Sequence, residues 1–243
     1  MVYESPRFLA GGDKALFIEF GNSITPELNR RVRQLMLAIQ NAGIPVITEA
    51  VPTYRSLLVY YNPLKIGLNE LRETLDALVQ KEEDSQFLKP KATQIPIIYG
   101  GEYGPDLEFV AKQNGLSVKA VVQIHTSNSY LIYMLGFIPG FAYLGGMSPR
   151  IATQRLETPR IKIPAGSVGI AGNQTGIYPA ESPGGWHLIG RTPLKLFDSN
   201  REPPALLQAG NYVTFVSITA EEFAIIREEV EQGIYVVKET PVI

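Results

Sequence analysis

The two histidines of the chain are its candidate general acid–base groups, because imidazole exchanges protons near neutral pH. His187 follows Trp186 in a glycine-rich segment, which favours a catalytic role. His125 ends an apolar helical run, where a packed structural histidine is more common than a catalytic one, so a structural role is the first interpretation and a catalytic role the alternative. Arg191 predicts bidentate binding of a carboxylate or phosphate, the alternative being a surface ion pair with a residue such as Asp198.

Glycine is concentrated in segment 136–193, which holds half of the chain's 22 glycines. Such clustering indicates tight turns, left-handed backbone, or a partner that approaches bare backbone. Residues 164–176 (PAGSVGIAGNQTG) carry glycine at every third position and end in amide and hydroxyl side chains. Backbone N–H groups, hydroxyls and an arginine predict an anion or phosphate groove, with Lys162 as a further point charge. The alternative is that these glycines serve only β-turns.

Several chemistries are excluded by what the sequence lacks. It has no cysteine, so disulfides and thiolate nucleophiles are absent. Two histidines far apart in the chain give no zinc motif, and we expect no metal site. No phosphate-binding loop of the G-x-x-x-x-G-K-[ST] type occurs, and Ser167 lies in G-S-V-G rather than in a nucleophile elbow.

Composition places the chain among globular proteins. It has 243 residues, is 45% hydrophobic, and carries a net charge of −2, which argues against a nucleic-acid partner. The start of the sequence shows no signal-peptide pattern, so a cytoplasmic protein is expected. Residues 126–149 are uncharged, but glycine and proline interrupt them. This predicts a buried strand leading into an apolar loop, not a membrane span.

The elements that must position these residues divide into two predicted domains. The first domain is expected over residues 1–92. The first 100 residues alternate strands and helices: strands over 15–20, 45–51, 56–61 and 94–98, and helices from Pro26 and over 68–80. Thr25 before Pro26 and Gly43 after the apolar spacing mark the ends of the first helix. The order βαββαβ predicts a ferredoxin-like N-terminal domain, an α+β arrangement.

Residues 93–243 form the second predicted domain. Helices are expected over 106–114 and 118–125, separated by Asn114 and Gly115. Short apolar runs punctuated by glycine and proline then predict a β-barrel or sandwich. Thr219 and Glu222 form a capping box that opens a final helix.

Two segments carry a resemblance to a known family: GFIPGFAYLGG (136–146) and PRIKIPAGSVGIAGNQTGIYPAESPGGWHLIGRTPLKLFD (159–198). The chain closely resembles the bacterial allophanate-hydrolase-subunit-1-like family, from GGDKALFIEFG near its start to its last helix. That family includes the B subunit of the prokaryotic 5-oxoprolinase and the kinase inhibitor KipI. The resemblance implies an N-terminal α/β domain followed by a cyclophilin-like β-barrel.

The resemblance also implies a function. It indicates a non-autonomous subunit of an ATP-hydrolysing enzyme that converts 5-oxo-L-proline to L-glutamate. The implied partners are the C subunit, which is allophanate-hydrolase-subunit-2-like, and the A subunit, which is LamB/YcsF-like. ATP with Mg²⁺ is the implied cofactor, in a site shared with a partner. The alternative is a KipI-like inhibitor of a sporulation histidine kinase, a protein-binding module without turnover.

The family motif extends the set of candidate residues. His125 stands at a histidine that the motif carries, whereas position 187 is not fixed in it; the catalytic candidates are His125, His187 and Arg191. The substrate and ATP groove is expected to comprise Lys162, Pro164, Gly166, Ser167, Gln174, Tyr178, Gly184, Gly185 and Trp186. The apolar loop is expected to form the interface with the C subunit through Phe137, Pro139, Phe141 and Tyr143.

Overall fold

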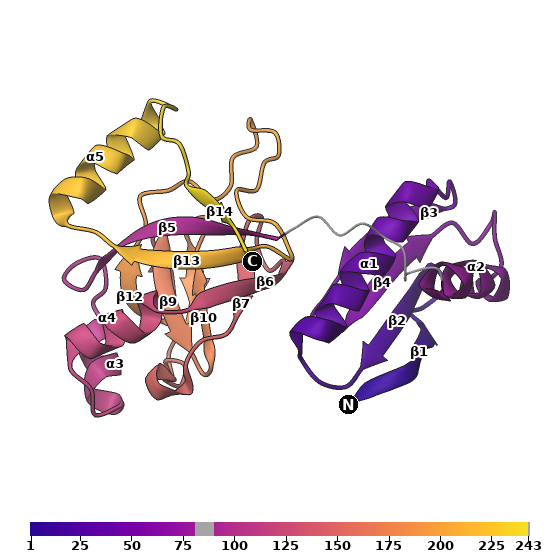
Figure 1. The fold of residues 1–243 in the computed structure, drawn as a ribbon, viewed down its shortest axis with the longest axis horizontal. Helices are drawn as coiled ribbons and strands as arrows, with labels where there is room; N and C mark the ends of the chain where they lie inside the picture. Colours follow the sequence, from indigo (N-terminus) through magenta and orange to yellow (C-terminus); the bar gives the residue numbers. More distant parts are fainter. Residues whose placement is uncertain (81–89, 243) are drawn as a thin grey trace. The chain divides into compact units, whose positions relative to one another are not determined.

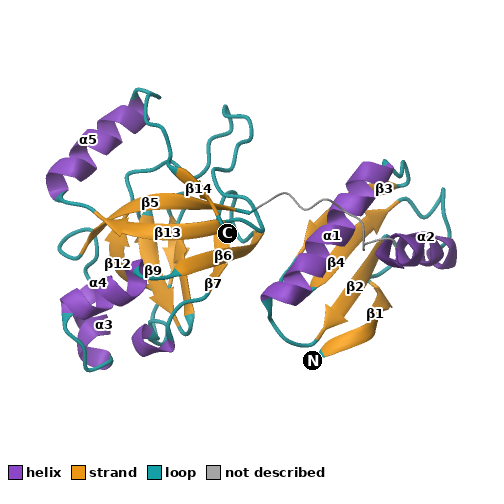
Figure 2. Ribbon diagram, viewed as in Figure 1, coloured by secondary structure: helices purple, strands orange, loops and turns teal. Residues whose placement is uncertain are grey.

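The computed structural model describes residues 1–80 and 90–242, and the chain divides into two compact units, Met1–Leu88 and Lys89–Ile243. We call them the N-terminal unit and the barrel unit; Figure 1 follows them along the chain and Figure 2 distinguishes their helices and strands. The predicted boundary between residues 92 and 93 lies inside the first strand of the barrel unit. Each unit encloses its own apolar core, as expected of separately packed domains.

The N-terminal unit is an antiparallel sheet in the order β1-β2-β4-β3, with two helices packed on one face (Figure 2). Its elements are β1 (Val2–Ala10), β2 (Ala15–Gly21), α1 (Pro26–Ala42), β3 (Ile47–Pro52), β4 (Ser56–Tyr61) and α2 (Leu68–Gln80). The predicted punctuation of α1 is confirmed: the hydroxyl of Thr25 accepts the N–H of Leu28, and Gly43 ends the helix at φ 57°.

The element order of this unit differs from the predicted βαββαβ. A split βαβ is present, because β4 pairs with both β2 and β3, the strands that α1 connects. The strand predicted over 94–98, however, belongs to the barrel unit, and β1 takes the edge position beside β2 instead. β1 was not predicted because Glu4, Pro6 and Arg7 break its alternation and most of its residues are exposed.

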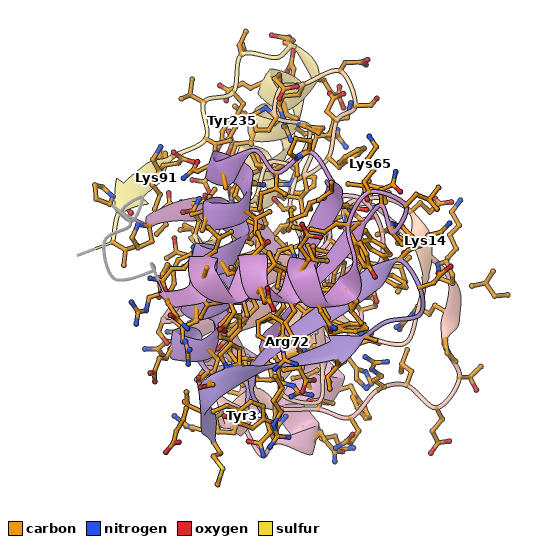
Figure 3. The ribbon with its side chains drawn as sticks, turned by 90° about the vertical axis from the view of Figure 1, so that its right-hand side faces the viewer. Tyr3, Lys14, Lys65, Arg72, Lys91 and Tyr235 are labelled. Atoms are coloured by element: carbon orange, nitrogen blue, oxygen red, sulfur yellow. The ribbon has the colours of Figure 1, made fainter. Side chains whose placement is uncertain are left out.

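Aromatic contacts hold this unexpected edge strand. The guanidinium of Arg7 lies 4.1 Å from the ring centroid of Tyr3, and that of Arg72 lies 5.4 Å from the ring of Phe8. Figure 3 labels Tyr3 on β1 and Arg72 on α2. The second contact ties the edge strand to a helix, so β1 is fixed by cation–π attraction as well as by its ladder.

The barrel unit is a nearly closed sheet in the order β10-β9-β12-β5-β13-β6-β7, with β14 paired to β5 and the end strands β7 and β10 in contact. This confirms a barrel-like sheet in a mixed α+β protein; the cyclophilin-like topology stays a prediction. The strands are β5 (Lys91–Tyr99), β6 (Ser129–Leu135), β7 (Ala142–Gly145), β8 (Arg160–Ile163), β9 (Ser167–Ala171), β10 (Gln174–Ile177), β11 (Ser182–Gly184), β12 (His187–Arg191), β13 (Tyr212–Ser217) and β14 (Glu239–Pro241).

Helices flank this sheet: α3 (Leu107–Gln113), α4 (Val118–Thr126), the 3₁₀ turn η2 (Pro149–Ile151) and α5 (Ala220–Glu231). The predicted capping box of α5 is confirmed, because Thr219 and Glu222 exchange both hydrogen bonds. The uncharged stretch is a strand, β6, followed by an apolar loop, as predicted. Among the described residues no helix is long and apolar enough to cross a membrane.

β13 joins the two halves of the barrel sheet. It runs parallel to β5 on one side and antiparallel to β6 on the other, so it connects β10-β9-β12-β5 with β6-β7. The core behind it combines residues of β5, β6, β9, β12 and β13 with those of α3 and α4. The rim of this core carries the candidate site.

Candidate functional site

His125 lies at the end of α4 and is fully buried in the barrel core. Thr175 donates its hydroxyl to the carbonyl of Gly169 at 3.0 Å, so its oxygen accepts the Nε2–H of His125 at 2.9 Å. Nδ1 is left to accept the hydroxyl of Tyr99 at 2.7 Å. Burial lowers the pKa of His125 to about 3, so the ring is neutral. With both nitrogens bonded and its surface enclosed, the geometry of His125 favours the structural interpretation over the catalytic one.

His187 lies on β12 at the wall of a cavity of about 530 Å³. Its ring stacks on Phe109 at a centroid distance of 4.8 Å. Its Nδ1 is buried without a hydrogen-bond partner among the described residues, and Asp106 Oδ2 lies 4.0 Å away, too far for a hydrogen bond. Nε2 is therefore the ring nitrogen available to the cavity. We call this space the histidine cavity; its wall includes Phe109, Gln113, Arg155, Glu157, Asn173 and His187.

Asp106 organises the wall of the histidine cavity. It stands at the N-cap of α3, but its side chain does not cap the helix. Oδ2 instead accepts the N–H of Leu188 at 2.7 Å, and Oδ1 pairs with Arg160 at 2.7 Å. Arg160 also donates to the carbonyl of Trp186 at 3.2 Å. These bonds hold the backbone on both sides of His187, so the ion pair sets the position of the imidazole.

Two glycines of the glycine-rich motif lie against Trp186. Gly169 on β9 and Gly176 on β10 are paired across the sheet. A Cβ at Gly169 would lie 3.0 Å from Trp186, and one at Gly176 would lie 3.1 Å from its ring. A side chain at either position would crowd the indole, so bare backbone suits both, which explains part of the spacing that the sequence shows.

The other glycines of the motif form turns whose N–H groups are engaged. Gly166 (φ 80°) donates to the carbonyl of Tyr178 at 2.7 Å, and Gly172 (φ 57°) donates to that of Thr153 at 2.7 Å. Both conformations favour glycine. Because these N–H groups already have partners, they do not form the predicted phosphate cradle.

A second cavity, of about 280 Å³, brings together the predicted groove and interface residues. We call it the aromatic groove; it is lined by Phe137, Phe141, Tyr143, Arg155, Tyr178, Pro183, Gly184, Gly185 and Trp186. Phe141, Tyr178 and Trp186 meet edge to face, with centroids 5.8–6.2 Å apart. Such edge-to-face packing fixes the ring planes, so the groove has a rigid apolar wall.

The predicted interface residues fall into two groups. Phe141, predicted to contact the C subunit, is only 3% exposed and packs inside the aromatic cluster. Little of its surface is therefore available to a partner. Tyr143 is half-buried beside it. Phe137 is 66% exposed and adopts φ 71°, a left-handed conformation that is strained for an aromatic residue. Pro139 is also exposed. Of the four predicted residues, therefore, Phe137 and Pro139 remain as an outward-facing surface.

Tyr178 and Arg155 give the aromatic groove its polar groups. Burial raises the pKa of Tyr178 to about 12, although the positive charge of Arg155 opposes this rise. The phenol therefore stays protonated at neutral pH. Arg155 is exposed, lines both the aromatic groove and the histidine cavity, and makes no ion pair within residues 1–80 and 90–242. It is the charged side chain shared by the two cavities.

Arg191 and Gly166 line a separate cavity of about 630 Å³ beside α5, the α5 cavity. The Nε of Arg191 donates to the carbonyl of Ala165 at 2.8 Å. Asp198, its predicted alternative partner, pairs instead with Lys195 at 2.8 Å, which lowers the pKa of the Asp198 carboxyl. Arg191 and His187 thus face different cavities.

The remaining predicted groove residues do not converge on one cavity. Lys162 pairs with Glu181 at 2.9 Å on the surface. Ser167 is buried inside the sheet, Gln174 is half-buried at the start of β10, and Pro164 is exposed. The structure therefore gathers Tyr178, Gly184, Gly185 and Trp186, and leaves the others outside the aromatic groove.

Sequence reasoning missed Arg155 and Asp106. Arg155 lies in a charged stretch, TQRLETPR, with no motif to mark it. Asp106 resembles an ordinary helix N-cap, and its bonds reach Arg160 and Leu188, far along the chain. The only local signal is an acidic residue before a helix, and that signal does not indicate which distant residues converge on it.

Comparison with known proteins places the chain in a family. A family model described as "Carboxyltransferase domain, subdomain C and D" matches residues 6–207, and the chain belongs to that family. It is 44% identical to the 5-oxoprolinase B subunit of Bacillus subtilis (strain 168) over 90% of this chain and 95% of that protein. It is 41% identical to the 5-oxoprolinase B subunit of Escherichia coli O157:H7 over 84% of this chain and 93% of that protein.

Solved structures resemble the chain as well. The conserved uncharacterized protein PH0987 of Pyrococcus horikoshii is 51% identical, with a TM-score of 0.54 over 89% of this chain and all of that one. The protein TTHA0988 is 37% identical, with a TM-score of 0.76 over 85% of this chain and 40% of that chain. These relatives confirm the resemblance that the central motif carries.

Proposed function

We propose that the chain is the B subunit of a 5-oxoprolinase, which opens 5-oxo-L-proline to L-glutamate in an ATP-dependent reaction. The observation that carries this proposal is the 44% identity, over nearly the whole of both chains, to a protein named as the B subunit of that enzyme. The aromatic groove agrees with it, because an apolar pocket with one free cation suits a small ring acid.

The chemistry of ring opening sets what the site must do. A lactam carbonyl is a poor electrophile. Transfer of the γ-phosphoryl group of ATP to its oxygen, with release of ADP, activates the carbon for attack by water, and cleavage of the ring C–N bond and release of phosphate then give the amine and the carboxylate of glutamate. The chain's part is to hold the ring, to stabilise charge and to move a proton. His187 is our candidate for the proton, through the Nε2 that faces its cavity, and Asp106 with Arg160 is the pair that positions it.

The described residues fit a nucleotide only in part. Among them, no group of three or more histidines or acidic residues could hold a metal ion. The α5 cavity has room for phosphates and carries Arg191, but Lys195 beside it is already paired with Asp198. We therefore propose that the ATP site is completed by a partner subunit.

Partner dependence is supported by the relatives, which are themselves named as subunits, and by the exposed apolar loop. We propose the C and A subunits of the same enzyme as the partners. Phe137 is the candidate anchor for the C subunit, because its ring is 66% exposed although one edge contacts Phe141, and its backbone is held in a strained left-handed conformation. The kinase-inhibitor alternative has no observation in its favour among the described residues.

The test is ADP release from the chain mixed with its two partner subunits, with and without 5-oxo-L-proline. We expect release that requires both this chain and the substrate. Absence of release from well-formed complexes would contradict the proposal and favour a protein-binding module, which autophosphorylation of a histidine kinase in the presence of the chain would then examine.

A further inference from the structure

The aromatic groove has a composition that specifies its ligand. Its wall is apolar and rigid, because the rings of Phe141, Tyr178 and Trp186 lock one another edge to face. Gly184 and Gly185 add bare backbone, and a Cβ at Gly184 would clash with the hydroxyl of Tyr178. At about 280 Å³ the groove is smaller than the 300–1,000 Å³ or so typical of drug-sized ligands. This size suits a small ring compound.

One charge lies at the edge of this apolar wall. Among the described residues that line the groove, Arg155 is the only charged one. It is exposed and forms no ion pair or hydrogen bond with another described residue, in contrast to Arg160, whose guanidinium pairs with Asp106 and is partly covered. A free guanidinium beside an apolar pocket offers two parallel N–H donors, the arrangement that a carboxylate accepts best.

The phenol of Tyr178 completes the set of polar groups. It lies within the electrostatic reach of Arg155 and stays protonated, so it adds a neutral donor and acceptor rather than a competing negative charge. Glu157, which lines the neighbouring histidine cavity, does not line the groove. The groove therefore presents one positive charge and no negative charge to its ligand.

We propose that the aromatic groove binds the ring acid itself, with the carboxylate of 5-oxo-L-proline paired to Arg155 and its ring against Trp186. This rests on the proposed function for the identity of the acid. Because Arg155 also lines the histidine cavity, the pairing places the ligand beside the space that Nε2 of His187 faces. Arg155 is thus a substrate-binding residue, not a partner-contact residue.

Trp186 makes the proposal measurable, since it is the one tryptophan of the chain. Titration of the isolated full-length chain with 5-oxo-L-proline is expected to change its fluorescence saturably. The lactam 2-pyrrolidinone and the amide of 5-oxoproline, which lack the carboxylate, are expected to bind roughly 10- to 100-fold more weakly, as loss of a charge-assisted pair predicts.

The matched variants are Arg155→Gln, Arg155→Lys and Arg150→Gln, the last an exposed arginine of η2 outside both cavities. Arg155→Gln is expected to weaken 5-oxo-L-proline roughly 10- to 100-fold and to abolish the preference over the amide. Arg155→Lys should restore part of the affinity, and Arg150→Gln should bind like the wild type. Wild-type affinity in Arg155→Gln, or no saturable response in the wild type, would overturn the proposal.

Turnover by the reconstituted complex separates this proposal from the proposed function. If ADP release proceeds with an unchanged KM in Arg155→Gln, the groove assignment fails and the function stands. If the chain binds the acid in an Arg155-dependent way but the complex releases no ADP, the groove stands and the function fails. A KM raised roughly 10- to 100-fold in Arg155→Gln supports both.

Discussion

The barrel core and the wall of the histidine cavity each hold one histidine, and the hydrogen bonding of these two side chains differs. In the core, both ring nitrogens are bonded, the ring stacks on Phe215 at 4.4 Å, and the backbone carbonyl of His125 accepts the hydroxyl of Tyr130. At the wall, Nδ1 of His187 has no partner among the described residues. Both ring nitrogens of His125 therefore have hydrogen-bond partners, whereas one ring nitrogen of His187 has none among the described residues.

The difference teaches where function lies in this domain. Unsatisfied or strained features gather around the two cavities: the orphan Nδ1 of His187, the buried hydroxyl of Ser182 without a partner among the described residues, the left-handed backbone of Phe137, and the free charge of Arg155. Proteins keep such features where another requirement outweighs stability. Buried polar groups with hydrogen-bond partners contribute to stability, whereas polar groups without partners in a cavity wall are available to a ligand.

Replacement of His187 should have the largest effect of these predictions: a large loss of activity with little change in the free energy of unfolding. In His187→Gln we expect kcat of the reconstituted enzyme to fall by about 10²–10⁴-fold, the usual contribution of a general acid or base. The free energy of unfolding should fall by only about 1–2 kcal/mol, because Nδ1 has no hydrogen bond to lose and the stacking on Phe109 is the main contact removed. Steady-state kinetics and urea unfolding measure the two effects.

The matched control for that variant is His125→Gln, which should lower the free energy of unfolding by about 2–5 kcal/mol and leave kcat of the folded complex unchanged. Loss of kcat in His125→Gln with normal stability would reverse the comparison.

The buried neutral state of His125 predicts a pH dependence of stability. The pKa of His125 is about 3 in the folded chain, and its ordinary value, taken for the unfolded chain, is 6.5. Between pH 3 and pH 6.5 His125 is therefore protonated in the unfolded chain and neutral in the folded chain. This contribution is complete above pH 6.5 and is lost toward pH 3, at about 1.4 kcal/mol per pH unit.

Urea unfolding across that pH range, in the wild type and in His125→Gln, isolates the contribution of this histidine. Carboxylates titrate in both proteins, so only the difference between the two profiles belongs to His125. Parallel profiles would show that the folded core accepts the proton.

The smallest predicted effect concerns the strained loop. Phe137→Gly should be more stable than Phe137→Ala by about 1 kcal/mol, because only glycine occupies φ 71° without strain. Comparison of the two variants removes the loss of the aromatic ring, which is common to both. Thermal unfolding of each variant measures the difference, and equal stabilities would mean that the loop relaxes when the ring is absent.

Local signals in the sequence predicted most elements of this fold. Thr25, Pro26 and Gly43 delimit α1, and Thr219 with Glu222 opens α5, because capping depends on residues three or four positions apart. The predicted order of the N-terminal unit is not confirmed, because strand 94–98 pairs within the barrel sheet and β1, whose sequence does not alternate, takes the edge beside β2. Pairing is decided by the burial of Ile95 and Ile97 in the barrel core, which no local pattern records.

The candidate site was predicted in part. The motif located Trp186, Tyr178 and the glycines, which the structure does gather, but it assigned the glycines to phosphate binding rather than to seating the indole. The roles of the two histidines could not be told apart. Thr175 and Tyr99, which saturate His125, lie 50 and 26 residues away in sequence, so only the folded chain shows their contact.

The parallel pairing of β13 with β5 has a consequence for the order in which the molecule assembles during synthesis. The N-terminal unit has all of its described elements once α2 has left the ribosome. The hydrogen-bonded ladder of the barrel sheet is interrupted between β5 and β6 until residues 212–217 emerge, because β13 lies between these two strands. Long-range pairing of this kind is slow and leaves strand edges open meanwhile. The nascent barrel therefore exposes β5 and β6 until β13 is made, which makes this interval the one in which a chaperone, or the partner protein itself, has most to protect.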